Sequence, residues 1–178
     1  MTLMEAAFRE TAHEAGGYVK GVATALVTQN KDDRGLCRVK VSYPWHENSS
    51  ESYWARFATP MAGKGRGIVT IPEIGDEVLV AFERDDIRFP CVLGGLWNGQ
   101  DLPPINNDDG KNDQRIIASR KKHHLLFDDG VTGVVELAHE KGRRIVLDDD
   151  GFVVEDEMGN MVKVDSNSGG MTIEAKGQ

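Results

Sequence analysis

The last third of the chain is a run of short apolar segments separated by Asp- and Gly-rich turns at nearly even spacing. Gly, Asn and Asp tolerate positive φ, so such separators are typical of tight turns. The pattern therefore predicts an array of short strands joined by turns. The expected strand cores are residues 125–127, 134–137, 145–147, 152–154, 161–164 and 171–175.

Side chains alternate between the two faces of a strand, so the array should have one apolar and one polar face. A single chain has no second layer to cover the apolar face, and roughly 70 residues of strand bury too little surface to be stable alone. We favour a homo-oligomeric β-prism or β-helix, in which copies cover each other; a flat meander packed on the first domain is the alternative. The expected apolar face holds Ile145, Leu147, Val162, Val164, Met171, Ile173 and Ala175, and the expected polar face holds Lys163, Thr172, Glu174 and Lys176.

The rest of the chain divides into an arm, a barrel and a linker. Helix-forming residues at 3–15, closed by two glycines, predict a short helical N-terminal arm over residues 1–17. Five strand signals within residues 18–99 suit a small closed barrel. They lie at 18–29, 35–43, 53–58, 77–83 and 90–96. The Pro-, Asn- and Asp-rich stretch 100–114 predicts a linker, and residues 115–178 form the expected strand array.

Charge and hydropathy exclude two classes of protein. The net charge is −8, and no basic cluster is larger than Arg120-Lys121-Lys122, which argues against nucleic-acid binding. No apolar run approaches the roughly 20 residues of a membrane span. The first residues also lack the basic and apolar regions of a signal peptide, so synthesis in the cytoplasm without export by a leader is expected.

The two cysteines, Cys37 and Cys91, lie in separate strand candidates without metal-ligand spacing. We expect both to be buried free thiols, with a disulfide as the alternative.

Candidate metal ligands are weak. Asp128-Asp129 and Asp148-Asp149-Asp150 could offer oxygens to Ca²⁺, but successive residues point in different directions, which favours a turn interpretation. His123 and His124 should face opposite sides of a strand, so they are not expected to share a zinc ion. The sequence thus predicts no metal and no cofactor.

Catalytic signals are equally weak. His13, His46 and His139 lack the spacing of a catalytic motif. The glycine-rich segment 63–67 lacks the ending of a phosphate-binding loop and is expected to be a flexible loop. We therefore expect no enzymatic activity.

A long combined pattern resembles the oligonucleotide/oligosaccharide-binding (OB) domain of central spike proteins, the VgrG and phage baseplate protein V group of contractile injection systems. It is carried by Gly21-Val22-Ala23, 35–41, Trp54-Ala55-Arg56, Met61-Ala62-Gly63, Gly67, 74–82 and 90–99. The segments 115–117, 124–129, 145–151 and 156–160 resemble the opening of that family's trimeric β-helix.

This resemblance implies a homotrimeric structural needle that belongs to a virion-like or injection-particle baseplate and pierces a target envelope when a sheath contracts. Only about 17 residues precede the first strand, so a separate hub protein is expected, contacted by Leu3, Met4, Ala7 and Phe8. The short linker and the end at Gln178 are expected to leave out lysozyme-like and effector domains, although effector cargo remains a possible partner. The resemblance does not separate phage, secretion-system and free-particle spikes.

A PAAR-type tip protein is expected to cap the end of the trimer, because uncovered apolar strand edges would otherwise meet water. The expected tip contacts are Met171, Ile173, Ala175, Lys176, Gly177 and Gln178, and the expected trimer core is Ile145, Leu147, Val162, Val164, Met171 and Ile173.

The competing interpretation is a binding module that holds an oligosaccharide or single-stranded nucleic acid on the barrel, with the array as an oligomerising stalk. Aromatic side chains could stack on such a ligand. The candidates are Tyr43, Trp45, Tyr53 and Trp54, and the negative net charge argues against them.

Overall fold

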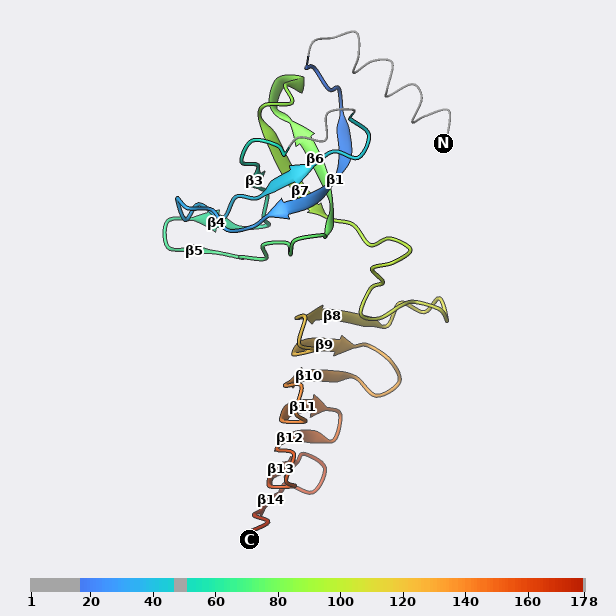
Figure 1. The fold of residues 1–178 in the computed structure, drawn as a ribbon. Coiled ribbons are helices and arrows are strands. Elements are labelled where there is room, and N and C mark those ends of the chain that lie inside the picture. The colour runs from blue at the N-terminus through green and yellow to red at the C-terminus, as the bar shows by residue number, and fades with distance from the viewer. Residues whose placement is uncertain (1–16, 47–50, 178) are drawn as a thin grey trace. The chain divides into compact units, whose positions relative to one another are not determined.

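The computed structural model describes residues 17–46 and 51–177. The chain divides into two compact units with the boundary between Leu102 and Pro103 (Figure 1). The predicted helical arm lies outside the described residues apart from Gly17, and so do its expected hub contacts Leu3, Met4, Ala7 and Phe8. No helix in the described ranges has the length and apolar composition needed to cross a membrane.

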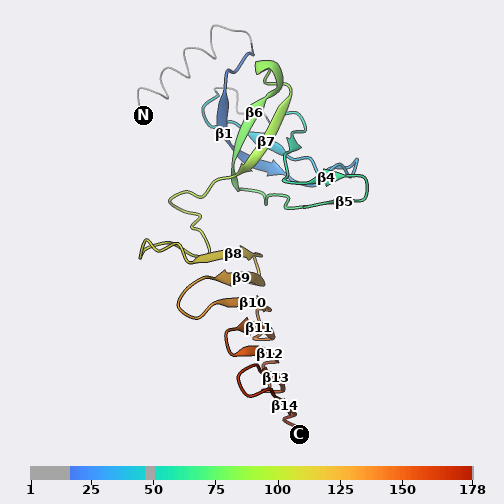
Figure 2. The same cartoon turned by 180° about the vertical axis from the view of Figure 1, so that it is seen from behind.

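The first unit is built on a five-stranded sheet in the order β2-β1-β6-β7-β3, whose strands β1, β6 and β7 are labelled in Figure 2. Neighbouring strands are antiparallel except β3 and β7, which are parallel. A short 3-10 turn, η1 (Glu83–Asp85), joins β6 to β7. The strands are β1 (Val22–Gln29), β2 (Lys40–Ser42), β3 (Arg56–Phe57), β6 (Glu77–Phe82) and β7 (Pro90–Gly95).

The two edges of this sheet are joined just before β2 and β3. Val39 and Ala55 exchange both backbone hydrogen bonds, with N–O distances of 3.0 and 2.7 Å. Inside, alternate residues of β1 and β6 point into one apolar core, as the period of a strand requires. The expected mainly-β fold with an OB-type barrel is confirmed. The core consists of Val19, Ala23, Ala25, Val27, Val39, Val41, Tyr43, Ala55, Val78, Val80, Phe82 and Val92.

Local backbone geometry corrects several expectations for this unit. The predicted strands 18–29 and 35–43 begin later, at Val22 and Lys40, because Gly21 and Cys37 adopt positive φ angles of 84° and 56°. Cys37 therefore lies in a loop, and it is exposed rather than buried, while Cys91 is half-buried; both are free thiols.

The glycine-rich segment 63–67 is a tight hairpin and not a loose loop. Strands β4 (Ala62–Gly63) and β5 (Arg66–Gly67) pair in antiparallel fashion. Gly65, at φ 67°, lies in the turn between them, in the left-handed region that glycine occupies without a steric penalty.

The second unit is a single antiparallel sheet of seven strands in strict sequence order, each hydrogen-bonded to the next. Tight turns connect the strands alternately at its two sides (Figure 1). The strands are β8 (Gln114–Ala118), β9 (His124–Asp128), β10 (Val134–Ala138), β11 (Arg144–Asp148), β12 (Gly151–Glu155), β13 (Met161–Asp165) and β14 (Gly170–Glu174).

This second unit has no core of its own. Among its described residues, 103–177, no residue falls in the buried class, whereas the first unit has twelve buried apolar residues. Hydrophobic burial is the main favourable contribution to folding, so backbone hydrogen bonds alone leave this sheet without its usual source of stability.

Candidate functional site

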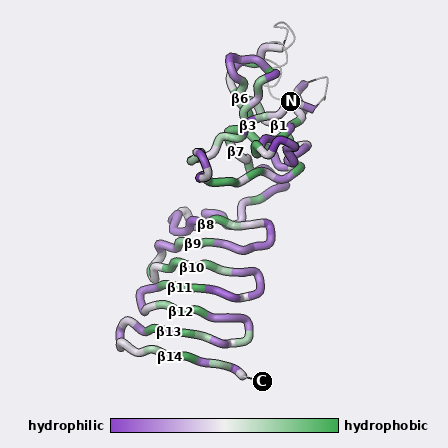
Figure 3. The backbone as a smooth tube through the Cα atoms, turned by 90° about the vertical axis from the view of Figure 1, so that its left-hand side faces the viewer, coloured by the Kyte–Doolittle hydropathy of each residue, from purple (hydrophilic) through white to green (hydrophobic). Residues whose placement is uncertain are grey.

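One face of the seven-stranded sheet is almost entirely apolar. Directly paired residues of antiparallel strands share a face, so the register assigns fourteen positions to it, of which only Arg115 is polar. Figure 3 shows the apolar strands between hydrophilic turns. We call this surface the apolar face; its other members are Ile117, Leu125, Phe127, Val135, Leu137, Ile145, Leu147, Phe152, Val154, Val162, Val164, Met171 and Ile173.

The apolar face lies open in the single chain. Leu137 is 53% exposed, Leu147 49% and Ile173 69%. Contiguous exposed apolar surfaces of this kind mark interaction sites. Covering the face would supply the burial that the second unit lacks.

The opposite face combines half-buried apolar side chains with charged ones, and it carries a connected set of ion pairs; the apolar side chains are Ile116, Leu126, Val146 and Val153. Glu136 lies 3.0 Å from His124 Nε2 and 3.8 Å from Arg144 Nη1, and Arg144 also pairs with Glu155. Its charged side chains are compatible with exposure to water, so this face is less apolar than the apolar face.

The six residues expected to form a trimer core all lie on the apolar face. Of the expected tip contacts, Met171 and Ile173 belong to β14, and Ala175 follows it. The backbone N–H of Lys176 donates to Asn160 Oδ1 at 2.7 Å. Gln178 lies outside the described residues. The roles of these residues in a trimer or at a tip stay predictions.

The aspartates weighed as calcium ligands form turns instead. Asp148 Oδ1 accepts the backbone N–H groups of Asp150 and Gly151, and Asp128 Oδ1 accepts that of Gly130. Asp165 accepts two backbone N–H groups in the same way. The side-chain amide of Gln114 holds the pKa of Asp128 below its usual value, and the backbone N–H of Ser168 does so for Asp165.

The histidines are directed to different partners. The rings of His123 and His139 lie 4.3 Å apart, whereas His124 pairs with Glu136, so the two adjacent histidines have different partners. His46 packs edge-on against Trp45, and His13 lies outside the described residues. Within residues 17–46 and 51–177 no three His, Cys, Asp or Glu side chains converge as metal ligands would.

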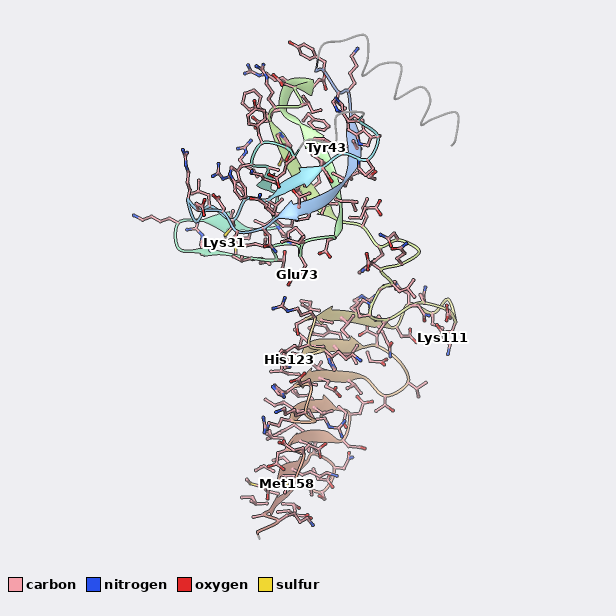
Figure 4. All side chains as sticks on the ribbon, in the orientation of Figure 1. Lys31, Tyr43, Glu73, Lys111, His123 and Met158 are labelled. Carbon is pink, nitrogen blue, oxygen red and sulfur yellow. The ribbon has the colours of Figure 1, made fainter. Side chains whose placement is uncertain are left out.

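Most of the aromatic residues considered as stacking platforms pack against other residues of the first unit. Tyr43 lies in the core against Trp45 and Phe82, at ring distances of 5.3 and 5.7 Å (Figure 4). Burial raises the pKa of Tyr43 to about 12. Trp45 Nε1 donates to the Thr24 carbonyl, and only Tyr53 is widely exposed, at 66%.

The fourth aromatic, Trp54, is covered by cations. Arg38 and Lys40 lie 5.5 and 5.2 Å from its ring centre, within the range of cation–π interactions. An open groove beside it has a volume of about 470 Å³ and is lined by Leu36, Arg38, Trp54, Arg56, Glu83, Arg88, Phe89 and Pro90.

The arginines of this groove already have carboxylate partners, in the pairs Arg38–Asp32, Arg56–Glu83 and Arg88–Asp86. Sequence reasoning missed this cluster. Its only signal was the alternation of Arg38 and Lys40 with buried valines.

Comparison with known proteins supports the barrel assignment. The injector OB domain of type VI secretion systems and phage baseplates matches residues 23–97. The type VI secretion system spike proteins VgrG1c and VgrG1a of Pseudomonas aeruginosa are 36% and 38% identical over 106 and 94 residues, or 55% and 48% of this chain. The actin cross-linking toxin VgrG1 of Vibrio cholerae is 35% identical over 94 residues. The matches cover only 15%, 15% and 9% of these three relatives.

Proposed function

We propose that this chain is a homotrimeric structural spike of a contractile injection machine, because residues 23–97 match the injector OB domain of type VI secretion systems and phage baseplates and the chain is similar to VgrG spike proteins. In this proposal the barrel forms a collar and the seven-stranded sheets of three copies form the needle. The needle punctures the target envelope when a sheath contracts.

The observation that carries the proposal is the combination of an open apolar face with the lack of a core in the second unit. Thirteen of fourteen positions on that face are apolar, and no described residue beyond position 102 is buried. Three sheets that turn this face inward around a common axis would bury it and supply the missing hydrophobic stabilisation.

A load-transmitting needle needs a folded base, and the first unit has the properties of one. Its twelve buried apolar residues and joined sheet edges give it a core that does not depend on neighbours. We therefore assign to the barrel the role of a stable collar and to the sheet the role of an obligate oligomer. The buried or covered aromatics favour this assignment over the alternative of a stacking platform for sugar or single strands.

The proposal extends to partners at both ends. We propose that a hub protein binds the N-terminal arm through Leu3, Met4, Ala7 and Phe8. A PAAR-type tip protein binds Met171, Ile173, Ala175, Lys176, Gly177 and Gln178, and effector cargo travels with it. Co-purification with hub and tip proteins tests these contacts, and failure of both to bind the assembled trimer would remove this extension.

We further propose that this chain acts mechanically and not as a catalyst. The relatives named as spikes support this view. The stretch shared with the Vibrio cholerae toxin amounts to 9% of that protein, which gives no ground for carrying over its cross-linking activity. Assays for peptidoglycan hydrolysis and actin cross-linking should both be negative.

The first experiment is the mass of the purified chain in solution by light scattering. We expect three times the 19.6 kDa of one chain. A variant truncated after Leu102, which retains the barrel core, should lose the association. A monodisperse monomer of the full chain would overturn the proposal.

A further inference from the structure

In the half of the seven-stranded sheet formed by β8–β11, the two sides carry opposite charge. Consecutive antiparallel strands turn at alternate ends, so the turns form two columns. The acidic column is made by the turns after β9, β11 and β13, and it holds six aspartates and no lysine or arginine between residues 128–134, 148–151 and 165–170. These are Asp128, Asp129, Asp148, Asp149, Asp150 and Asp165.

The basic column lies on the other side of the sheet, in the turns after β8 and β10. It holds six cations and one carboxylate, Glu140, between residues 118–124 and 138–144. His123 marks this side in Figure 4. The cations are Arg120, Lys121, Lys122, Lys141, Arg143 and Arg144.

Turn formation explains only part of this pattern. Asp128, Asp148 and Asp165 accept backbone N–H groups of their own turns. Asp129 pairs with Arg115, and Asp150 accepts from the Asn167 amide. Asp149 has no partner in the described part of the chain, and the same holds for the ammonium groups of three lysines, Lys121, Lys122 and Lys141.

We infer that these two columns bind each other between neighbouring copies, so that the acidic column of one protomer lies against the basic column of the next. The inference rests on the proposed trimer. A three-fold axis that turns every apolar face inward places one side of each sheet beside the opposite side of its neighbour, which is a heterologous contact that closes into a ring. Opposite charge on the two sides makes that contact attractive.

The attraction is confined to the half of the sheet formed by β8–β11. The third turn on the basic side, after β12, carries Glu155, Asp156 and Glu157 instead of cations. Glu155 and Glu157 are paired within the chain to Arg144 and Arg143. The charged columns therefore fix the register and the order of the copies along β8–β11, whereas the apolar face supplies the adhesion along the whole sheet.

Charge reversal tests the inference in the full-length protein. Three variants are needed: K121E/K141E, D129K/D149K, and the combination of all four changes. Light scattering at low salt measures the trimer midpoint concentration, which is the protein concentration at which half of the chains are in trimers. Each double reversal should raise the trimer midpoint concentration about tenfold or more. The reason is that several exposed charge pairs between copies change from attraction to repulsion in each of the three contacts. The combination should return it to within about threefold of the native value, because the columns are again opposite in sign.

Salt provides an independent readout. Exposed charges are screened at high ionic strength, so the differences between variants should shrink at about 1 M salt, where the Debye length is about 3 Å. Lys163→Glu is the matched control, since this exposed lysine lies on the opposite face, in the middle of β13, and not in a column. It should leave the midpoint unchanged.

The outcomes separate the two proposals. A native trimer whose midpoint is unaffected by the double reversals, or a combination weaker than either double variant, would overturn the inferred contact and leave the trimeric spike intact. A native chain that is monomeric would overturn the proposed function itself. Circular dichroism of each variant shows whether its strands have formed, and rescue by the combined variant excludes misfolding as the cause of the losses.

Discussion

Arg38 and Asp32 form a two-point ion pair across the loop that precedes β2: Arg38 Nε donates to Oδ2 at 2.7 Å and Nη2 to Oδ1 at 2.8 Å. The same carboxylate accepts the backbone N–H groups of Arg34 and Leu36. It thereby fixes the loop and also the guanidinium, which lies over Trp54.

Replacing Asp32 by Asn should lower the melting temperature, because the amide cannot accept both guanidinium bonds and keep the two backbone bonds. The hydrogen bond from Arg38 holds the pKa of Asp32 below its ordinary value of 3.8. A carboxyl whose pKa is depressed on folding stabilises the protein above its ordinary pKa, and that contribution is lost as the pH falls through the folded value.

The difference in melting temperature between the native protein and Asp32→Asn should therefore be full near pH 7 and shrink below about pH 4. Thermal unfolding followed by circular dichroism measures it. Asp33→Asn, an exposed neighbour in the same loop, is the control and should behave as the native protein does. A difference that stays constant down to pH 2 would show that the charge of Asp32 is not the cause.

Tyr43 should make the barrel sensitive to alkali. Burial raises the pKa of Tyr43 to about 12, so folding favours the neutral phenol. Its contribution to stability is complete below the ordinary tyrosine pKa near 10 and is lost as the pH rises toward 12, by about 3 kcal/mol in all. Tyr43→Phe should remove the late step from a tyrosinate absorbance titration and flatten the alkaline loss of stability. Tyr53→Phe, at an exposed site, should leave both unchanged.

Gly151 at the start of β12 should be intolerant of any side chain. Its φ of 145° is a backbone conformation that essentially only glycine adopts. A Cβ at this position would overlap the Val164 carbonyl oxygen. Gly151→Ala should cost more than about 3 kcal/mol in thermal or denaturant unfolding of the assembled protein. Gly169→Ala is the matched control, because its φ is 71° and nothing lies within 4 Å of the added carbon. It should cost only about 1 kcal/mol, and equal losses would contradict the close approach.

Periodicity was sufficient to predict the strand array, because Asp- and Gly-rich turns at short intervals permit little else. The alternation of apolar residues likewise grouped Ile145 with Leu147 and Val162 with Val164 on one face, as the register shows. These features depend on neighbours in sequence.

Features set by single φ angles or by distant neighbours were not predictable. Nothing in the composition of 35–39 shows that Cys37 turns into the left-handed region, so its exposure was missed. The strands of the hairpin at Gly65 are only two residues long, which is too short for the sequence pattern to distinguish them from a flexible loop. The opposite charge of the two turn columns depends on which turns share a side of the sheet, and the strand order decides that.

Neighbouring positions of one strand offer the sharpest test of the trimeric spike. Leu147 lies on the apolar face of β11 and Val146 on the opposite face, in the same strand. Leu147→Asn should raise the trimer midpoint concentration at least about tenfold, because each copy would bury an amide without partners at a cost of roughly 1–3 kcal/mol. Val146→Asn makes the same change on the opposite face and should leave the midpoint within about threefold of the native value, since this half-buried position pairs with Glu136 and lies away from the surface proposed to be shared. Light scattering over a concentration series measures both. Equal effects of the two substitutions would mean that the apolar face is not the surface that the copies share, and the needle would need a different packing.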